Sequence, residues 1–387
     1  MSNMYAGIKR EFAKDPAAGR RCAERLLKIR ERLKPLHERK CDATLLLATW
    51  NIRDFEYNRY GFGPRLPETY YYIAEMISAF DLVAVQEVNR DLRGLEKVMA
   101  ILGREWDYIA TDATAGAGGN DERMAFVFNR EKVFFRKIAG EIVLPKGQMI
   151  VAPKKIDASK TVDGTAPAEA PKEEPAEALQ FARTPFLVAF QSGWFRFSLC
   201  TAHLYYGEAS GVALQRRINE IKGLVHFFAD RQDRDSEQEK DRYGVVENYI
   251  LLGDFNVVSP THKTMEALKS EGFVVPDAID GKTVRRLGDH FYDQIAVRVK
   301  DPRFEVLGGG MVPVFDDVFT DADQPIYAGV VPAKDPEKGA AKKAKTPEDI
   351  YRKWRTWQMS DHHPLWIEIA TDFSDQYLAD LAAGEQP

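Results

Sequence analysis

The sequence predicts a protein of the α/β or α+β class, in which β-sheets are covered by helices. From residue 43 onward, short apolar runs that suit buried strands alternate with longer amphipathic segments that suit helices. The composition, with 44% hydrophobic and 29% charged residues among 387, is typical of a chain that buries a large core. It excludes a disordered chain, a collagen-like fibre and a small disulfide-stabilised fold.

The first predicted element is a basic amphipathic helix over Pro16–Lys34, whose apolar residues are spaced for one face. Pro35 is expected to end it, because proline donates no backbone hydrogen bond. Residues 1–40 carry a net charge of +7 and the remainder −12. We therefore expect residues 1–41 to form a basic N-terminal helical extension. It would either pack on the following domain, which is favoured, or bind a nucleic acid or another partner.

Eight strands are predicted from runs of β-branched, aromatic and other apolar residues that are bounded by turns. They are Thr44–Thr49, Leu82–Gln86, Met124–Asn129, Phe186–Phe190, Phe195–Ala202, Tyr249–Gly253, Gln294–Val299 and Leu365–Ala370. Four further segments have helical periodicity. These are Glu68–Ala79, Leu92–Leu102, Ala213–Asp230 and Lys263–Ser270.

Residues 42–370 are predicted to form one domain, followed by a C-terminal tail over residues 371–387. Residues 146–180 and 331–347 are expected to be mobile insertions, since they hold too few large apolar residues to offset the entropy of ordering. The three cysteines do not make a disulfide framework. Without a signal-peptide core or a run of about 18 apolar residues, a cytoplasmic protein with no membrane span, taken as a monomer, is expected.

Polar residues stand where the predicted strands begin or end, at the sheet edge where ligands commonly bind. In chain order they are Asn51, Glu87, Glu122, Arg183, His203, Asp254, Asn256, Asp293, Asp361 and His362. Each alone has a structural explanation, such as an asparagine in a turn or a hydrogen-bonded histidine. Their joint occurrence in this order predicts a functional site.

These residue types suit metal-assisted cleavage of a phosphoester. Carboxylate and amide oxygens without thiolates favour a hard cation, Mg²⁺ or Mn²⁺. Two histidines with carboxylate partners can act as general acid and base. Arg183 can donate two hydrogen bonds to a phosphate, and Tyr205 could stack on a base or sugar or cover the sheet edge. The net charge of −5 gives no indication of a surface that binds polyanions, but it does not exclude a phosphate substrate.

In order and residue type, these motifs resemble those of the endonuclease/exonuclease/phosphatase superfamily, which includes pancreatic-type deoxyribonuclease. The resemblance extends from about residue 43 to residue 369. It implies a four-layer α-β-β-α sandwich like that of the deoxyribonuclease, with two packed mixed β-sheets, helices outside and the active site at one end.

The resemblance also implies roles for the residues that match the family's motifs. Glu87, Asn51 and Asp361 would belong to the metal site. Asp254 and Asn256 would activate or orient the attacking water and hold the phosphate.

The remaining matches surround two catalytic histidines. His362 would pair with Asp293, and His203 would be oriented by Glu122. Arg183 resembles an arginine that contacts the phosphate, and the sequence does not decide which histidine is the acid and which the base.

The predicted function is that of a divalent-metal-dependent phosphodiesterase, a nuclease that hydrolyses DNA or RNA. The expected cofactor is Mg²⁺ or Mn²⁺, and a second divalent ion such as Ca²⁺ is a further option. The alternative is a phosphatase or phospholipase C-type phosphodiesterase that acts on inositol phosphate, sphingomyelin or another small phosphoester. The segment YDQIAV lacks the arginine- and cysteine-containing motif of inositol polyphosphate phosphatases, which favours the nuclease.

Overall fold

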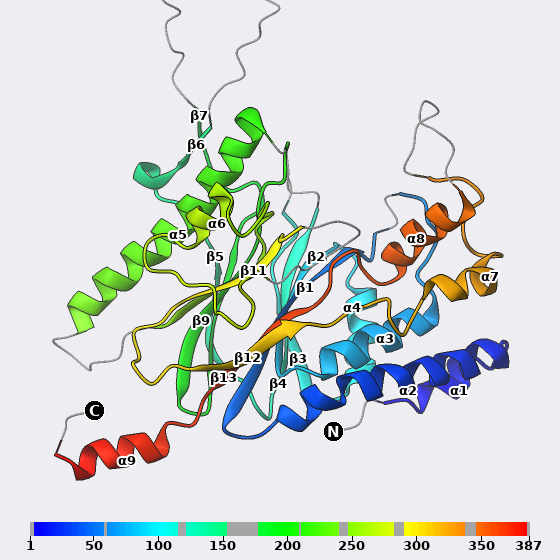
Figure 1. Ribbon diagram of the computed structural model, residues 1–387, viewed down its shortest axis with the longest axis horizontal. Coiled ribbons are helices and arrows are strands. Elements are labelled where there is room, and N and C mark those ends of the chain that lie inside the picture. Colours follow the sequence, from blue (N-terminus) through cyan, green and yellow to red (C-terminus); the bar gives the residue numbers. More distant parts are fainter. Residues whose placement is uncertain are drawn as a thin grey trace, which may run out of the picture.

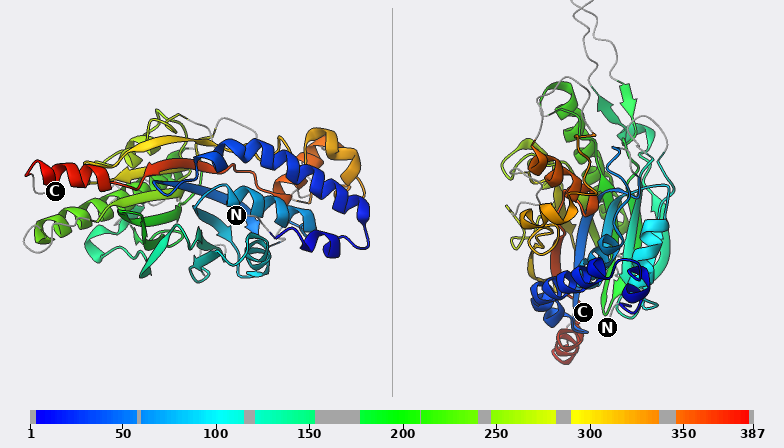
Figure 2. Two further views of the ribbon diagram at one scale, coloured as in Figure 1. Left: turned by 90° about the horizontal axis from the view of Figure 1, so that it is seen from below. Right: turned by 90° about the vertical axis from the view of Figure 1, so that its right-hand side faces the viewer.

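The computed structural model describes residues 4–57, 60–114, 121–152, 177–208, 210–239, 247–281, 290–336 and 346–384. Two β-sheets pack face to face, and helices cover their outer faces (Figures 1 and 2). Within the described ranges, no helix is long and apolar enough to cross a membrane.

One sheet, called sheet A, has six strands. Their order is β12 (Val306–Met311), β13 (Leu365–Ala370), β1 (Thr44–Phe55), β2 (Leu82–Val88), β4 (Arg123–Asn129) and β3 (Trp106–Ala110). The sheet is mixed, since β1 runs parallel to β2 and antiparallel to β13.

The facing sheet, called sheet B, has five strands. Their order is β11 (Asp293–Arg298), β10 (Tyr249–Asp254), β9 (Phe195–His203), β8 (Phe186–Ser192) and β5 (Phe134–Glu141). This sheet is also mixed, because β10 runs parallel to β9 and antiparallel to β11. A separate two-stranded sheet pairs β6 (Ile150–Ala152) with β7 (Glu177–Leu179).

Both faces of β1 are buried, which explains its continuous apolar sequence. Because side chains alternate along a strand, Leu45 and Leu47 face the interior between the sheets and belong to the same core cluster as Leu251 of β10. Leu46 and Ala48 point the other way and pack with the helices that cover sheet A.

The helices form the two outer layers. Sheet A is covered by α2 (Pro16–Arg39), α3 (Pro67–Ser78), α4 (Arg93–Leu102) and α8 (Pro347–Gln358). Sheet B is covered by α5 (Gly211–Glu239) and α6 (Lys263–Leu268). The short elements are α1 (Gly7–Glu11), α7 (Gln324–Tyr327), α9 (Ser374–Ala382) and the 3₁₀ turns η1 (Lys146–Gln148) and η2 (Asp321–Asp323). The structure therefore has the predicted four-layer sandwich of two packed mixed sheets with helices outside.

The prediction that Pro35 ends the first helix is wrong, because α2 continues to Arg39. Proline removes one backbone hydrogen bond and crowds the preceding turn. The next turn nevertheless buries Leu36 in the same cluster as Leu33, and this burial compensates for the lost bond.

The predicted insertion at 146–180 contains regular structure at its ends. Residues 146–152 and 177–179 form η1, β6 and β7, and Ile150 of β6 reaches the core beside α5. In the second predicted insertion, Asp335 pairs with Lys353 and Pro347 begins α8. The predictions for residues 153–176 and 337–345 lie outside the described residues.

Helix α2 shares one core with the domain. Its buried residues, which lie on one face, are Ala18, Cys22, Leu26, Ile29, Leu33 and Leu36. Arg21 lies 3.0 Å from Glu68 of α3, and Arg39 lies 2.7 Å from Glu368 of β13. The apolar face thus anchors the helix, and arginines beside that face pair with acids of the domain.

Two leucine substitutions in α2, one at a buried and one at an exposed position, test whether the helix packs on the domain. Leu33 is 1% exposed, so Leu33→Ala should leave a cavity and lower the free energy of unfolding by about 2–5 kcal/mol. Leu27 is 68% exposed, and Leu27→Ala should change it by less than about 0.5 kcal/mol. Urea unfolding followed by circular dichroism measures both. Equal effects would contradict the packing of α2 on the domain.

Candidate active site

The polar residues predicted from strand boundaries come together at one end of the sandwich. Strands β9 and β10 end at His203 and Asp254, whereas the antiparallel strand β11 begins at Asp293. In the sheet register Asp254 lies directly between these two residues, opposite His203 on one side and Asp293 on the other. In the facing sheet, Glu87 lies near the end of β2, and Asn51 lies within β1, paired with the neighbouring Gln86.

The side-chain amide of Asn51 connects the two sheets. Its Nδ2 donates hydrogen bonds to Glu87 Oε1 at 2.9 Å and to Asp254 Oδ2 at 3.1 Å. Asn51 is fully buried, and its Oδ1 has no hydrogen-bond partner among the described residues. A buried carbonyl oxygen without a partner is rare in folded proteins, so a water or an ion is the expected occupant beside it.

The carboxylate of Glu87 is held in a fixed position by an irregularity between β1 and β2. Their pairing shifts register after Asn51, and Glu87 has a left-handed backbone φ of 60°. The backbone N–H of Asp54 donates to Glu87 Oε2 at 2.9 Å. Bulges of this kind commonly redirect a side chain beside an active site.

His203 is oriented by Glu122, which precedes β4. His203 Nδ1 lies 2.9 Å from Glu122 Oε2, and Arg183 Nε lies 2.8 Å from the same oxygen. The opposite ring nitrogen, Nε2, lies 3.7 Å from Asp254 Oδ2 and 4.0 Å from Glu87 Oε1. Burial and Arg183 lower the pKa of His203, but the charges of Glu122 and Asp254 outweigh them and raise it.

His362, in the loop before β13, has the same arrangement. Its Nδ1 lies 2.5 Å from Asp293 Oδ2, and its Nε2 lies 3.9 Å from Asp254 Oδ2. Burial opposes the charged imidazole, but Asp293 and Asp254 raise the pKa of His362 well above its ordinary value. Burial also raises the pKa of Asp293 to about 6 against the influence of His362.

The two histidines therefore present Nε2 to the same oxygen, Asp254 Oδ2, from two sides. Each has a separate carboxylate at Nδ1, which fixes the orientation of the ring and favours its charged form. This placement of a carboxylate between two oriented, charged imidazoles allows the carboxylate to accept one proton and an imidazole to donate another, as general acid–base catalysis requires.

Two of the predicted substrate-binding residues have other partners. Besides Glu122, the Arg183 guanidinium donates to the carbonyl oxygens of His203 at 3.4 Å and Leu204 at 3.5 Å. The Tyr205 ring lies 4.2 Å from the guanidinium of Arg216. These contacts of Arg183 position the His203 segment, and its predicted role in phosphate binding stays a prediction.

Asn256 and Asp361 lie beside the central residues. Asn256 donates its backbone N–H to Asp254 Oδ1 at 2.9 Å and its side-chain amide to the Leu204 carbonyl at 2.9 Å. Asp361 is half-buried, and its charge contributes to the raised pKa of His362. Their predicted roles in phosphate and metal binding stay predictions.

Sequence reasoning missed the residues that hold the site's backbone. Glu220 of α5 accepts hydrogen bonds from the backbone N–H of Tyr205 at 3.0 Å and of Ala182 at 3.2 Å. Trp50 Nε1 donates to the carbonyl of His362 at 3.0 Å. The sequence of a helix does not indicate that one of its charged side chains binds the backbone of a distant segment. The sequence therefore contained no signal for these contacts.

The residues present suit a magnesium-like ion with few protein ligands. In the described part of the chain, no group of three or more His, Cys, Asp or Glu is placed so that these side chains alone could hold a metal ion. Asn51 Oδ1 and the Glu87 carboxylate, whose side chain is 18% exposed, offer hard oxygens next to each other. Mg²⁺ commonly binds one or two carboxylates and keeps several of its waters.

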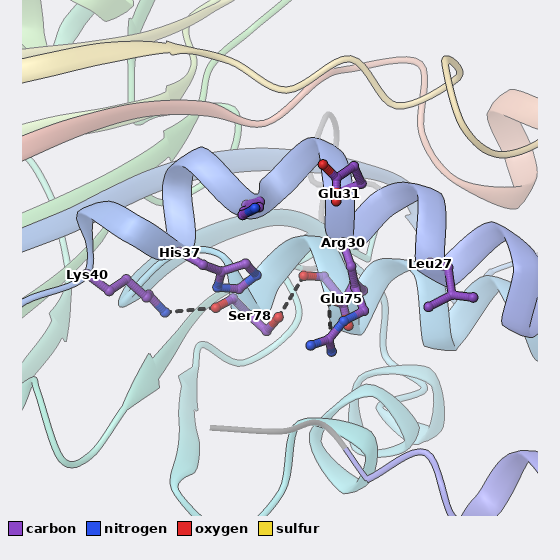
Figure 3. A pocket seen from close by; sticks show the side chains of 8 residues that line it. Leu27, Arg30, Glu31, His37, Lys40, Glu75 and Ser78 are labelled. Atoms are coloured by element: carbon purple, nitrogen blue, oxygen red, sulfur yellow. Dashed lines mark hydrogen bonds and ion pairs between the residues drawn. The ribbon is translucent and has the colours of Figure 1, made fainter.

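A pocket of about 630 Å³ lies between α2 and α3 (Figure 3). None of the residues that line it belongs to the cluster around Asp254. It is lined by Leu27, Arg30, Glu31, Lys34, His37, Lys40, Glu75 and Ser78. Lys40 Nζ donates to the carbonyl of Ser78, and Arg30 lies 3.8 Å from Glu75. Burial and the charges of Lys40 and Arg30 lower the pKa of His37 to about 4, so this ring is neutral. His37 therefore adds no positive charge to this pocket.

No protein-family model matches the sequence, and no curated protein is similar to it. Solved structures do match, and the names of two of them contain the words endonuclease/exonuclease/phosphatase. One, from Bacteroides thetaiotaomicron, has 19% sequence identity and a TM-score of 0.49 over 85% of this chain and 96% of that one.

Two further matches carry functional names. A mannosyl-6-phosphatase from the same organism has 19% identity and a TM-score of 0.47 over 84% of this chain and 99% of that one. The D. rerio TDP2 structure complexed with single strand DNA product has 11% identity and a TM-score of 0.44 over 85% of this chain and 100% of that one.

The contact between Glu122 and His203 predicts a titration shift. Glu122→Gln removes the charge that raises the pKa of His203 and leaves the opposing charge of Arg183 in place, so this pKa should fall. NMR titration of the imidazole signals measures it, with His203→Asn to assign the resonance. Glu131→Gln, at a site outside this cluster, is the control. An unchanged pKa in Glu122→Gln would contradict the contact.

Proposed function

We propose that the protein is a divalent-metal-dependent phosphodiesterase of the endonuclease/exonuclease/phosphatase superfamily, a nuclease that hydrolyses DNA or RNA. One observation carries the proposal: His203 and His362 both direct Nε2 at Asp254 Oδ2, beside the Asn51–Glu87 pair. Hydrolysis of a phosphodiester takes a proton from the attacking water and gives a proton to the leaving oxygen, and this arrangement provides groups for both transfers.

In the proposed hydrolysis, the charge and position of each residue determine its role. Asp254 is the group that can accept the proton of an attacking water, because its Oδ2 lies at the centre of the site. The charged imidazoles of His203 and His362 can donate a hydrogen bond to a non-bridging phosphate oxygen or a proton to the leaving oxygen. Their carboxylate partners keep both rings oriented through this exchange.

The balance of charge supports a requirement for a divalent cation. Among the described residues of the cluster, four carboxylates, those of Glu87, Glu122, Asp254 and Asp293, lie with three basic side chains, those of Arg183, His203 and His362. An anionic phosphate would meet a site without surplus positive charge. A cation held by Glu87 and Asn51 would supply that charge and stabilise the oxygens of the phosphate.

The alternative substrates are small phosphoesters, including inositol phosphates and sphingomyelin. They would use the same residues, so the site geometry alone favours neither class. We also retain a cytoplasmic monomer as part of the proposal.

The first test is a substrate panel with the full chain. Single-stranded and duplex DNA, RNA, inositol phosphates and sphingomyelin are incubated with Mg²⁺ or Mn²⁺, and products are separated by chromatography. We expect cleavage of DNA or RNA that stops when EDTA removes the metal. Activity on a small phosphoester without cleavage of any polynucleotide would overturn the nuclease proposal, and activity in EDTA would overturn the metal requirement.

A second test concerns the metal ligand. Glu87→Gln should weaken Mn²⁺ binding and lower kcat by about 100-fold or more, because it removes a charged oxygen ligand. Calorimetry with Mn²⁺ measures binding separately from activity. Glu96→Gln, an exposed residue on α4, is the matched control and should bind Mn²⁺ like the unaltered protein. Equal binding by both variants would remove Glu87 from the metal site.

A further inference from the structure

Three aromatic rings continue from the catalytic His362 towards solvent. The Tyr292 ring lies 6.1 Å from that of His362, measured between ring centroids. His290 stacks on Tyr292 at 4.7 Å with an interplanar angle of 12°, and Tyr206 meets Tyr292 edge-on at 6.0 Å. Tyr206, Tyr292 and His290, here called the aromatic wall, come from the segments that follow β9 and precede β11.

The aromatic wall is partly open to solvent. Tyr206 is 53% exposed, His290 is exposed and Tyr292 is half-buried. A large aromatic ring left half in water beside buried catalytic groups has unused apolar surface. The tyrosine hydroxyls and the imidazole nitrogens of the wall also provide polar atoms. A surface of this kind suits a flat polar ring better than a lipid chain.

A buried arginine holds this wall in a fixed relation to the catalytic residues. Arg217 of α5 is 2% exposed, and its guanidinium lies 5.1 Å from the Tyr206 ring. It donates to the carbonyl oxygens of Tyr206 and Glu208 and, at 3.0 Å, to that of Asn256. Because Asn256 also donates its backbone N–H to Asp254, one guanidinium fixes both the aromatic segment and the segment that carries the central carboxylate.

We propose that the aromatic wall is a stacking subsite for a nucleobase, next to the scissile phosphodiester. The inference rests on the proposed phosphodiesterase function and adds the part of the substrate that is recognised. When the phosphate of a nucleotide lies at Asp254, its base, which is attached through the sugar, would lie beside the wall. The flat face of the base is similar in size to the ring of Tyr206. Stacking of one base on an aromatic side chain tolerates any base sequence. The wall therefore favours nucleic acid over inositol phosphates, which have no flat ring.

The test compares substrates that differ by one base. Thymidylyl-thymidine is hydrolysed in parallel with its two abasic analogues, in each of which one base is replaced by hydrogen, with product release followed by chromatography. The measured quantity is the kcat/KM of the dinucleotide divided by that of each analogue. In the unaltered protein we expect this ratio to exceed one for the analogue that lacks the stacked base.

Three variants locate the effect. Tyr206→Ala should lower that ratio by about 5- to 100-fold, which corresponds to the loss of one stacked base. Tyr206→Phe keeps the ring and should retain the ratio. Trp194→Ala is the matched control, since Trp194 is 49% exposed and lies in the turn before β9, at the opposite end of that strand from His203.

The outcomes separate the inference from the function on which it rests. A ratio that falls in Tyr206→Ala alone supports the subsite. A ratio that is the same in Tyr206→Ala and Trp194→Ala overturns the subsite, although the phosphodiesterase function would stand. If the unaltered protein with Mg²⁺ or Mn²⁺ hydrolyses neither the dinucleotide nor longer DNA or RNA, the nuclease function itself is overturned.

Discussion

The site depends on one buried amide, the side chain of Asn51, which donates to an acid of its own sheet and to an acid of the facing sheet. Hydrogen bonds to charged groups contribute about 1.5–3 kcal/mol each, and a buried carboxylate that loses its donor costs more. The two sheets can therefore pack only where Asn51 reaches both Glu87 and Asp254. Since Asp254 Oδ2 is also the atom that both histidines approach, the packing of the sheets determines the geometry of the proposed proton transfer.

Polar contacts on either side of Asn51 strengthen this constraint. Towards the interior, Gln86 Nε2 donates to Thr49 Oγ1 at 3.0 Å and to Thr201 Oγ1 of the facing sheet at 2.8 Å, and all three are fully buried. Towards the site, Ser360 Oγ donates to the Asn51 carbonyl and accepts from the N–H of His362. Apolar side chains alone would tolerate several registers between the sheets, whereas these hydrogen bonds form in one.

Much of the fold was predictable because its central strands are buried on both faces and read as apolar runs. The strands β3, β5, β6, β7 and β12 were not predicted. Of these, β5 is largely exposed and β12 contains three consecutive glycines. The convergence of the polar residues followed from where the strands end. Two details could not be predicted from the strand ends. Asn51 lies within β1, because the strand continues to Phe55, and Arg183 forms an ion pair with Glu122. Both depend on contacts between distant segments, which local patterns do not contain.

The uneven charge of the chain is balanced within the fold. Arginines of α2 pair with acids on α3, β13 and residues 317–323, so the +7 segment complements an acidic surface of the same domain. Charges paired in this way produce little field beyond about one Debye length, roughly 8 Å at physiological salt. Attraction of a distant polyanion by α2 is therefore weak. Under the proposed function, substrate recognition depends on groups at the site itself. The oriented imidazoles would act on the phosphate, and the aromatic wall would act on what is attached to it.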